Sequence, residues 1–253
     1  MRVGIYQCKA GTVAPEDRLR DLETRLRGQA LDLLVCPELF LSGYTPGPAL
    51  HDLAEPQDGP FGRAVADLAA QSGTAIAYGY PEQADGQLFN AAVLYDGRGM
   101  LIANHRKRLP SPGSFEETAF GRGDAVTFAD LNGWRVAMII CYEVEFPEIL
   151  RQAALGGAQL IIVPTALGAD WSVVAEHVVP TRAYENGLWI AYADQVGEAD
   201  GLAFYGGSRI VGPDGNAHAV AGRKEALITA TMQIDEVNRM RARILFLRDC
   251  AEL

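Results

Sequence analysis

The sequence has few of the residues that bind metals or form disulfides. Its four cysteines show no C-x-x-C pair and no regular spacing, and its four histidines are scattered along 253 residues. A zinc site requires closely spaced ligands, and a disulfide framework in a small domain requires densely paired cysteines. We therefore predict reduced thiols and no metal site.

Long apolar runs and an excess of positive charge are also lacking. No apolar run reaches the roughly 18–20 residues of a membrane span, and the first residues lack the apolar stretch and cleavage site of a signal peptide. The chain carries 32 acidic and 22 basic residues, a formal net charge of −10. This charge argues against nucleic acid and anionic membranes as partners. We expect a soluble, cytoplasmic protein.

Apolar strand-like segments alternate with amphipathic helix-like segments along the chain. Since 49% of the residues are hydrophobic, residues 1–253 can bury one large core and are predicted to form a single domain. Strands are expected at residues 2–8, 31–36, 74–80, 89–95, 100–106, 125–129, 134–140, 159–163, 188–196, 207–211 and 225–232, and helices at residues 15–29, 61–72 and 172–186, after Cys141 and at the C-terminal end. The alternation indicates an α/β or α+β fold. Two apolar strands that end in proline, 31–37 and 158–164, suggest two similar halves with a cleft between strand ends.

Cys141 stands between a predicted strand and a predicted helix. Residues 134–140 are mostly apolar and rich in branched side chains, and Pro147 suits the first turn of a helix. Unpaired N–H groups at a helix start carry partial positive charge, which favours the thiolate over the thiol. A lone free cysteine usually only packs in a core, so its interpretation depends on the residues that accompany it.

Two further polar residues stand where apolar strands end. Glu38 follows the strand at 31–36, and Lys107 follows the strand at 100–106. Because α/β folds tend to bind ligands at strand ends, Glu38, Lys107 and Cys141 are predicted to share one site. Glutamate can accept the thiol proton, and lysine and the backbone N–H of Tyr142 can stabilise an oxyanion. The set therefore suits thiol attack on an amide.

Three motifs around these residues resemble the signature regions of the nitrilase superfamily, the carbon–nitrogen hydrolases with a Glu-Lys-Cys triad. They are Cys-Pro-Glu-Leu-Phe-Leu-Ser-Gly-Tyr (36–44), His-Arg-Lys-Arg-Leu-Pro (105–110) and Cys-Tyr-Glu-Val-Glu-Phe-Pro-Glu (141–148). Further support comes from the motifs at 163–166, 182–186 and 206–215, so the resemblance runs from residue 3 to about residue 235.

The resemblance implies a fold, an assembly and a reaction. The fold is a single-domain αββα sandwich, which pairs through its helices with a second subunit, so we expect a homodimer or a higher homo-oligomer. Residues 236–253 are expected to form a subunit-contact tail. The reaction is hydrolysis of a nonpeptide C–N bond through a covalent acyl-enzyme, with neither a metal nor an organic cofactor.

Further site residues follow from the resemblance. Related enzymes often carry another glutamate some ten residues beyond the lysine, where both Glu116 and Glu117 stand. Glu116 is favoured, because Phe120 then falls where these proteins usually carry an aromatic residue. The substrate-binding residues that the resemblance implies are Tyr44, Glu143, Thr165 and Ala166.

The predicted function is hydrolysis of a small aliphatic or amino-acid amide to a carboxylic acid and ammonia. The alternatives on the same triad are an N-carbamoyl amino-acid or amine hydrolase and a nitrilase. A catalytically idle member acting as a binding or scaffold protein, and a redox-sensing thiol with Cys36 as its partner, also stay open. His177 offers a rival Cys-His pair, although it lies inside a predicted helix. Asp194 stands where asparagine is common in the family, which leaves the charge of the pocket open.

Overall fold

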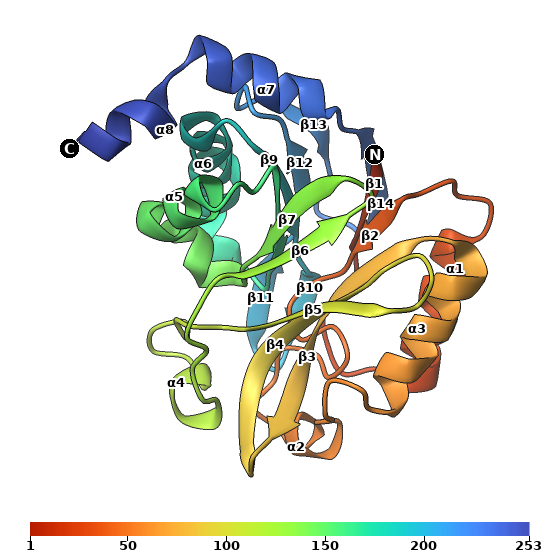
Figure 1. Ribbon diagram of the computed structural model, residues 1–253. Coiled ribbons are helices and arrows are strands. Elements are labelled where there is room, and N and C mark those ends of the chain that lie inside the picture. The colour runs from red at the N-terminus through yellow and green to blue at the C-terminus, as the bar shows by residue number, and fades with distance from the viewer. Residues whose placement is uncertain (253) are drawn as a thin grey trace.

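Two six-stranded sheets stack face to face in the computed structural model, which describes residues 1–252 (Figure 1). The first sheet has the order β14 (Ala226–Thr231), β1 (Arg2–Gln7), β2 (Leu33–Val35), β3 (Ala75–Ala84), β4 (Gln87–Tyr95) and β5 (Leu101–Arg106). The second has the order β13 (Ala217–Val220), β12 (Arg209–Val211), β9 (Trp189–Ala193), β8 (Leu160–Pro164), β7 (Trp134–Met138) and β6 (Thr127–Leu131).

Helices lie around the two sheets (Figure 1). They are α1 (Pro15–Leu26), α2 (Ala49–Asp52), α3 (Pro60–Ser72), α4 (Glu116–Ala119), α5 (Pro147–Leu155), α6 (Val179–Asn186), α7 (Ile234–Arg243) and α8 (Phe246–Asp249). Proline stands in the first turn of α1, α3 and α5, where its missing N–H costs no helical hydrogen bond. None of the helices among the described residues has both the length and the hydropathy to cross a membrane.

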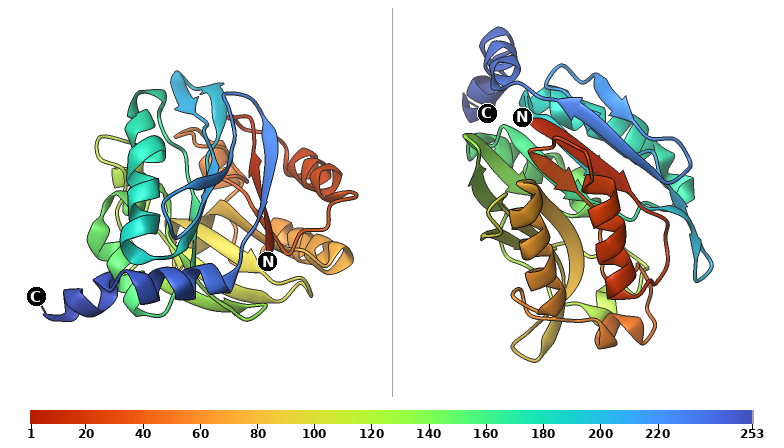
Figure 2. Two further views of the ribbon diagram at one scale, coloured as in Figure 1. Left: turned by 90° about the horizontal axis from the view of Figure 1, so that it is seen from above. Right: turned by 90° about the vertical axis from the view of Figure 1, so that its right-hand side faces the viewer.

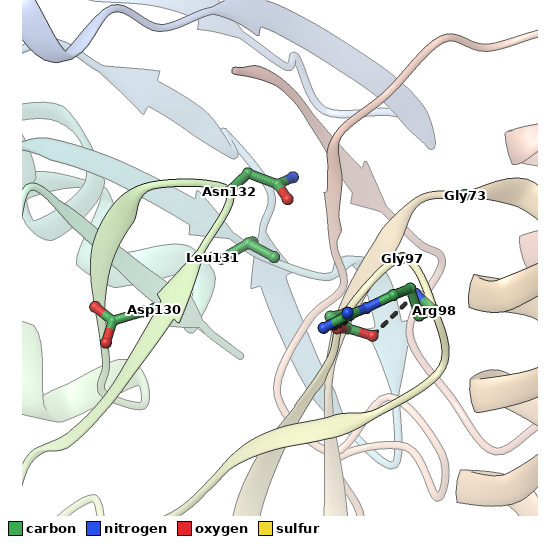
Figure 3. A pocket seen from close by; sticks show the side chains of 7 residues that line it. Gly73, Gly97, Arg98, Asp130, Leu131 and Asn132 are labelled. Atoms are coloured by element: carbon green, nitrogen blue, oxygen red, sulfur yellow. Dashed lines mark hydrogen bonds and ion pairs between the residues drawn. The ribbon is translucent and has the colours of Figure 1, made fainter.

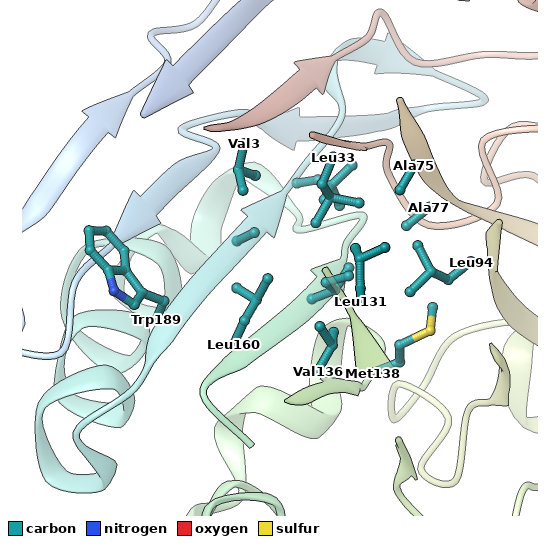
Figure 4. Packing of buried hydrophobic residues seen from close by; sticks show 14 of the residues in the cluster. Val3, Leu33, Ala75, Ala77, Leu94, Leu131, Val136, Met138, Leu160 and Trp189 are labelled. Carbon is teal, nitrogen blue, oxygen red and sulfur yellow. The ribbon is translucent and has the colours of Figure 1, made fainter. Parts of the chain in front are cut away.

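Three apolar layers hold these elements together. The inner layer fills the space between the sheets, with Val3 and Leu33 on one side and Leu160 and Trp189 on the other (Figure 4). A second layer packs α1 and α3 on the first sheet, and a third packs α5 and α6 on the second sheet. The predicted αββα sandwich is confirmed.

The two halves place similar strands at the centre of each sheet. Strands β1, β2 and β3 run parallel, and so do β9, β8 and β7. The two proline-terminated segments of the sequence, β2 and β8, are the middle strands of these trios. The segments that follow their carboxyl ends lie side by side, as shown by the hydrogen bond from the Glu38 N–H to the carbonyl of Thr165 at 3.3 Å. The strand ends therefore converge as the sequence predicted.

The helix expected at 172–186 is divided. Val174–Val178 form a π-helical turn, and α6 follows it. Pro180 lies in the first turn of α6, and since it has no N–H, the regular pattern of helical hydrogen bonds is interrupted there. The single predicted helix was therefore wrong in detail.

The strand expected at 188–196 was also too long. Strand β9 ends at Ala193, and a separate hairpin follows, built from β10 (Val196–Ala199) and β11 (Leu202–Tyr205). Its turn is Asp200-Gly201, and both residues have positive φ, 50° and 75°. An Asp-Gly pair is a strong hairpin signal, which the sequence interpretation overlooked.

The C-terminal segment leaves the sandwich along one edge. Helices α7 and α8 lie beside the second sheet, and the last turn extends away from the rest of the chain (Figure 2). The expected subunit-contact tail, 236–253, corresponds to this segment, except for residue 253, which lies outside the described residues.

Candidate active site

Cys141 occupies a sharp turn at the end of β7. Its φ of +48° lies in the left-handed region, which is rare for a residue other than glycine. The residue opens a 3₁₀ turn, Cys141–Glu145, and α5 begins at Pro147, as the sequence predicted. The side chain is 8% exposed. A strained, nearly enclosed thiol at a strand end is the usual setting of a functional nucleophile.

Glu38 is fully buried and has one oxygen free. Its Oε1 accepts hydrogen bonds from Asn90 Nδ2 and from Lys107 Nζ, both at 2.7 Å. Its Oε2 has no hydrogen-bond partner among the described residues. Gln195 Nε2 donates to the Glu38 carbonyl at 2.8 Å and holds the backbone. The arrangement orients the carboxylate and leaves one acceptor for a proton.

Lys107 lies between two buried carboxylates. It follows β5, and its Nζ lies 2.7 Å from Glu38 Oε1 and 2.7 Å from Glu116 Oε2. A third, longer hydrogen bond reaches Ser111 Oγ at 3.3 Å. The side chain is 2% exposed. The ammonium is therefore fixed in place, and its weakest contact is the one to Ser111.

The two candidate glutamates lie in different surroundings. Glu116, at the start of α4, is fully buried; besides its contact with Lys107, it accepts a hydrogen bond from the Tyr44 hydroxyl at 2.5 Å. Glu117 is exposed and accepts from the Gly113 backbone N–H at 3.1 Å. The structure thus brings Glu116, and not Glu117, beside the lysine.

The charges of these groups are set by burial and by one another. Burial raises the pKa of Glu38, although Lys107 and Asn90 act in the opposite sense. Burial lowers the pKa of Lys107, but Glu38 and Glu116 outweigh it and raise that pKa well above its ordinary value. Lysine therefore stays protonated, and Glu38 is better able to hold a proton than a free carboxylate.

The thiol does not have the low pKa that its place before a helix suggested. Burial raises the pKa of Cys141 well above its ordinary value, and Glu38 raises it further, while Lys107 and a hydrogen bond from the Ala166 backbone lower it. Desolvation therefore outweighs the partial positive charge of the turn, which by itself would favour the thiolate. A thiol that stays protonated requires a base during attack.

Three of the four predicted pocket residues lie in or beside one apolar cluster. Tyr44 and Ala166 belong to one apolar cluster with Leu39 and Phe204, and the ring of Tyr44 packs edge-on against Phe115 with centroids 5.0 Å apart. Thr165 is fully buried beside this cluster, and its hydroxyl donates to the Val163 carbonyl at 3.1 Å.

Glu143 was wrongly assigned to the substrate pocket. Its carboxylate is fully buried and accepts from the backbone N–H groups of Ile140 and Arg108, and it pairs with His105. Both oxygens are therefore occupied by the protein itself. A carboxylate saturated in this way holds the chain and does not bind a ligand.

Asp194 is enclosed in a similar manner. Its Oδ1 accepts from the backbone N–H groups of Leu167 and Gln195, both at 2.8 Å, and its Oδ2 has no hydrogen-bond partner among the described residues. Burial raises the pKa of Asp194 well above its ordinary value, and the two N–H groups offset this only in part. Asp194 therefore holds the loop after β8 through Oδ1, and its burial disfavours the charged form.

Asp194→Asn is expected to stabilise the protein at alkaline pH. The pKa of Asp194 is higher in the folded state than in the unfolded chain. Its contribution to the free energy of unfolding is therefore fully present below about pH 4, and it is lost as the pH rises toward the folded-state pKa. Asparagine does not ionise, so the free energy of unfolding of the variant should exceed that of the wild type by about 1–3 kcal/mol at pH 8 and by less at pH 5. Thermal unfolding at both pH values measures the gain. Asp200→Asn, in the exposed β10–β11 turn, should show no such pH-dependent gain.

The rival partners of Cys141 lie elsewhere. His177 is exposed in the π-helical turn. Cys36 packs with the helix-side layer of the first sheet, whereas Cys141 packs with the layer between the sheets. The proposed redox partner therefore faces the other side of the sheet. Arg182 donates to the carbonyls of Val144 and Glu145, so it supports the turn after the cysteine.

A separate cavity of about 500 Å³ lies at the other end of the sheets. It is bounded by the β4–β5 turn, with Gly97 and Arg98, and by the β6–β7 turn, with Leu131 and Asn132 (Figure 3). These turns precede β5 and β7, whereas Lys107 and Cys141 follow the same strands. The cavity therefore does not belong to the candidate site. Within residues 1–252, no three acidic, histidine or cysteine side chains converge on a metal position.

The sequence interpretation missed two residues that hold Glu38. Asn90 lies inside an apolar strand, β4, and is 1% exposed. A buried amide among apolar neighbours is the signal that could have marked it, since buried polar groups need partners. Gln195 follows the end of β9, and no pattern in its own segment distinguishes it.

Comparisons with known proteins agree with this geometry. A model of the carbon–nitrogen hydrolase family matches residues 2–242. The chain is 41% identical to a protein described as the hydrolase in the pqqF 5′ region of Pseudomonas protegens, over 98% of this chain and 88% of that protein. It is 33% identical to an (R)-stereoselective amidase from a Pseudomonas species, over 86% of this chain and 79% of that protein.

Solved structures of an amidase also match this chain. An amidase from Nesterenkonia, in a cysteine-to-alanine variant bound to butyramide, superposes with a TM-score of 0.86 at 32% identity, over 96% of this chain and 95% of that chain. In another structure of that amidase, with the same TM-score and identity over 96% of this chain and 97% of that chain, acrylamide has added to the active-site cysteine. The chain therefore belongs to the carbon–nitrogen hydrolase family, the nitrilase superfamily of enzymes that hydrolyse nonpeptide C–N bonds.

Proposed function

We propose that this enzyme hydrolyses a small aliphatic amide to a carboxylic acid and ammonia, with Cys141 as nucleophile, Glu38 as base and Lys107 as oxyanion donor. One observation carries the proposal. The buried carboxylate of Glu38 is held through Oε1 by Lys107 and Asn90, and it keeps Oε2 free beside a thiol that needs a base.

The first half of the reaction forms a thioester. The Cys141 sulfur attacks the amide carbon while its proton passes to Glu38 Oε2. The oxyanion takes hydrogen bonds from the Tyr142 N–H and from Lys107, whose long 3.3 Å bond to Ser111 is the one it can exchange for the substrate. Glu38 then gives the proton to the leaving nitrogen, the C–N bond breaks and ammonia departs.

The second half restores the enzyme. Water attacks the thioester carbon and loses a proton to Glu38, and the same donors hold the second oxyanion. The C–S bond breaks, the carboxylic acid leaves, and the proton returns from Glu38 to the sulfur of Cys141. One water is consumed, and no external oxidant or reductant is needed.

Glu116→Gln is expected to lower kcat/KM for amides by about 10²-fold, because the carboxylate helps Glu38 to align the ammonium of Lys107. Glu117→Gln is the matched control and should retain full activity, since its side chain is exposed and accepts a hydrogen bond from the Gly113 backbone, away from Lys107. Steady-state ammonia release measures both variants. Equal losses in the two variants would remove Glu116 from the proposed site.

The surroundings of the site favour an apolar acyl group. Tyr44 packs edge-on against both Phe115 and Phe204, and Phe120 packs against Phe115. Both oxygens of Glu143 accept hydrogen bonds from the protein, and burial disfavours the charged form of Asp194, so neither side chain is suited to bind the ammonium of an amino-acid amide. The butyramide bound to the Nesterenkonia amidase is a ligand of this apolar kind.

A panel of substrates tests the proposal. Ammonia release is measured with acetamide, propionamide, butyramide, amino-acid amides, N-carbamoyl amino acids and nitriles. Aliphatic amides are expected to be turned over with the highest kcat/KM. Preference for N-carbamoyl amino acids or for nitriles would move the assignment to one of those hydrolases, and no turnover in a folded protein would favour an idle binding protein.

We also propose that the enzyme forms a homodimer through α7 and α8. The adjacent side chains of Leu245 and Phe246 are 39% and 41% exposed in this segment, so a second subunit could cover apolar surface there. Light scattering after size-exclusion chromatography tests the assembly, and a monomer at micromolar concentration would exclude it. All four cysteines are free, which supports the predicted location in a reducing compartment such as the cytoplasm.

A further inference from the structure

Glu143 makes three contacts that connect different parts of the chain. Its Oε2 accepts from the Ile140 backbone N–H at 2.7 Å and pairs with His105 Nε2 at 2.9 Å. Its Oε1 accepts from the Arg108 backbone N–H at 3.0 Å. The side chains of Glu143 and His105 are both fully buried. No other acidic side chain in the 3₁₀ turn Cys141–Glu145 has such contacts among the described residues.

The partners of Glu143 lie beside the nucleophile and the cation of the proposed site, Cys141 and Lys107. Ile140 immediately precedes Cys141 at the end of β7 in the second sheet. His105 and Arg108 stand on either side of Lys107, at the end of β5 in the first sheet. A single carboxylate therefore joins the turn that presents the thiol to the segment that presents the ammonium, across the two sheets.

The Glu143 carboxylate is charged, and its partner His105 is itself held in place. Burial raises the pKa of Glu143, but His105 and the two backbone N–H groups outweigh it and bring that pKa below its ordinary value, so the carboxylate is ionised at neutral pH. Hydrogen bonds to an ionised acceptor are short and strong. His105 Nδ1 lies 3.2 Å from Thr127 Oγ1 on β6, which fixes the imidazole ring.

We propose that Glu143 is a positioning residue that sets the separation between the Cys141 thiol and the Lys107 ammonium. The inference rests on the proposed function, in which the sulfur reaches the carbonyl carbon while the ammonium reaches its oxygen. These two contacts must form together, and a displacement of about 1 Å in such a pair can cost about 10²-fold in rate. Without Glu143, the backbone N–H of Ile140 would lose its acceptor, and this hydrogen bond supports the chain just before the left-handed conformation of Cys141.

Glu143→Gln tests the inference, with Glu148→Gln as the matched control. The glutamine amide nitrogen can only donate, so it faces an N–H donor from Ile140 or Arg108 and breaks one side of the bridge. We expect kcat for the best amide to fall about 10²-fold while KM changes less than about threefold. Glu148 is exposed on α5, and its variant should keep the kcat of the wild type.

A second pair of variants keeps the test decisive if Glu143→Gln does not fold. His105→Leu removes the donor to Glu143, whereas His105→Gln keeps an N–H in a comparable place. Positioning predicts that kcat falls in the leucine variant and is largely restored in the glutamine variant, with KM little changed in both. A purely structural role predicts equal kcat per folded molecule in the two variants, and that result would overturn the inference.

The proposed function and this inference fail in different ways. Retained turnover in Cys141→Ala would refute the proposed function. Loss of turnover in Cys141→Ala, together with a folded Glu143→Gln that has the wild-type kcat, would refute only the positioning role. A rise in KM at constant kcat would also refute it, because that pattern marks substrate binding.

Discussion

Cys141→Ala is expected to lower kcat for amide hydrolysis by about 10⁴-fold or more while the protein stays folded. Removal of a nucleophile eliminates the covalent route, and what remains is the weak assistance of the oxyanion donors. The side chain is 8% exposed and alanine is smaller, so the turn should tolerate the change. Ammonia release under saturating amide measures the loss, and circular dichroism verifies the fold.

Cys250→Ala is the matched control for this experiment. Cys250 is only partly buried and lies in the C-terminal segment, away from the strand ends that form the site. It should retain the wild-type kcat. Mass spectrometry adds a direct test, because the wild type mixed with an amide should gain the mass of an acyl group and the Cys141→Ala protein should not. Full activity in Cys141→Ala would contradict the proposed mechanism.

Lys107→Met is expected to abolish amide hydrolysis and also to destabilise the fold. The variant removes the oxyanion donor, for which a loss of about 10³-fold is typical. It also leaves the fully buried carboxylates of Glu38 and Glu116 without their cation, which costs about 3–5 kcal/mol at neutral pH. Denaturant unfolding measures the stability, and ammonia release measures the activity.

The loss of stability in Lys107→Met should depend on pH with a definite sign. Without the ammonium, the folded-state pKa of Glu38 rises further above its unfolded value. Stability is then retained at low pH, where both states are protonated, and is lost as the pH rises above about 4. The deficit relative to the wild type should therefore be smaller at pH 5 than at pH 8.

Arg108→Met separates these effects from a general loss of positive charge. Arg108 is adjacent in sequence, and within residues 1–252 its guanidinium has one hydrogen bond, to Gln152 at 3.5 Å. Its backbone N–H, which binds Glu143, is unchanged by the substitution. This variant should keep both activity and stability. If Lys107→Met were as stable and as active as Arg108→Met, the lysine would have no role in the site.

The sequence by itself determined the elements and the chemistry at their ends. Apolar runs that end in Pro37 or Pro164, and helices that begin at proline, are set by local sterics and hydrogen bonding, so they can be read from neighbouring residues. Glu38, Lys107 and Cys141 could be identified for the same reason, since each follows directly after an apolar strand. The family resemblance then predicted how these strands are arranged, and the structure confirmed the sandwich.

Only the tertiary structure decided how these residues act on one another. The assignment of Glu116 over Glu117, the support of Glu38 by Asn90 and the protonated state of Cys141 depend on groups far apart in the sequence. Glu143 is the clearest case, because the family resemblance suggested a pocket residue. The surrounding backbone occupies both of its oxygens instead. Burial and hydrogen-bond partners are set by long-range packing, and they determine whether a carboxylate binds substrate, accepts a proton or holds two strands in place.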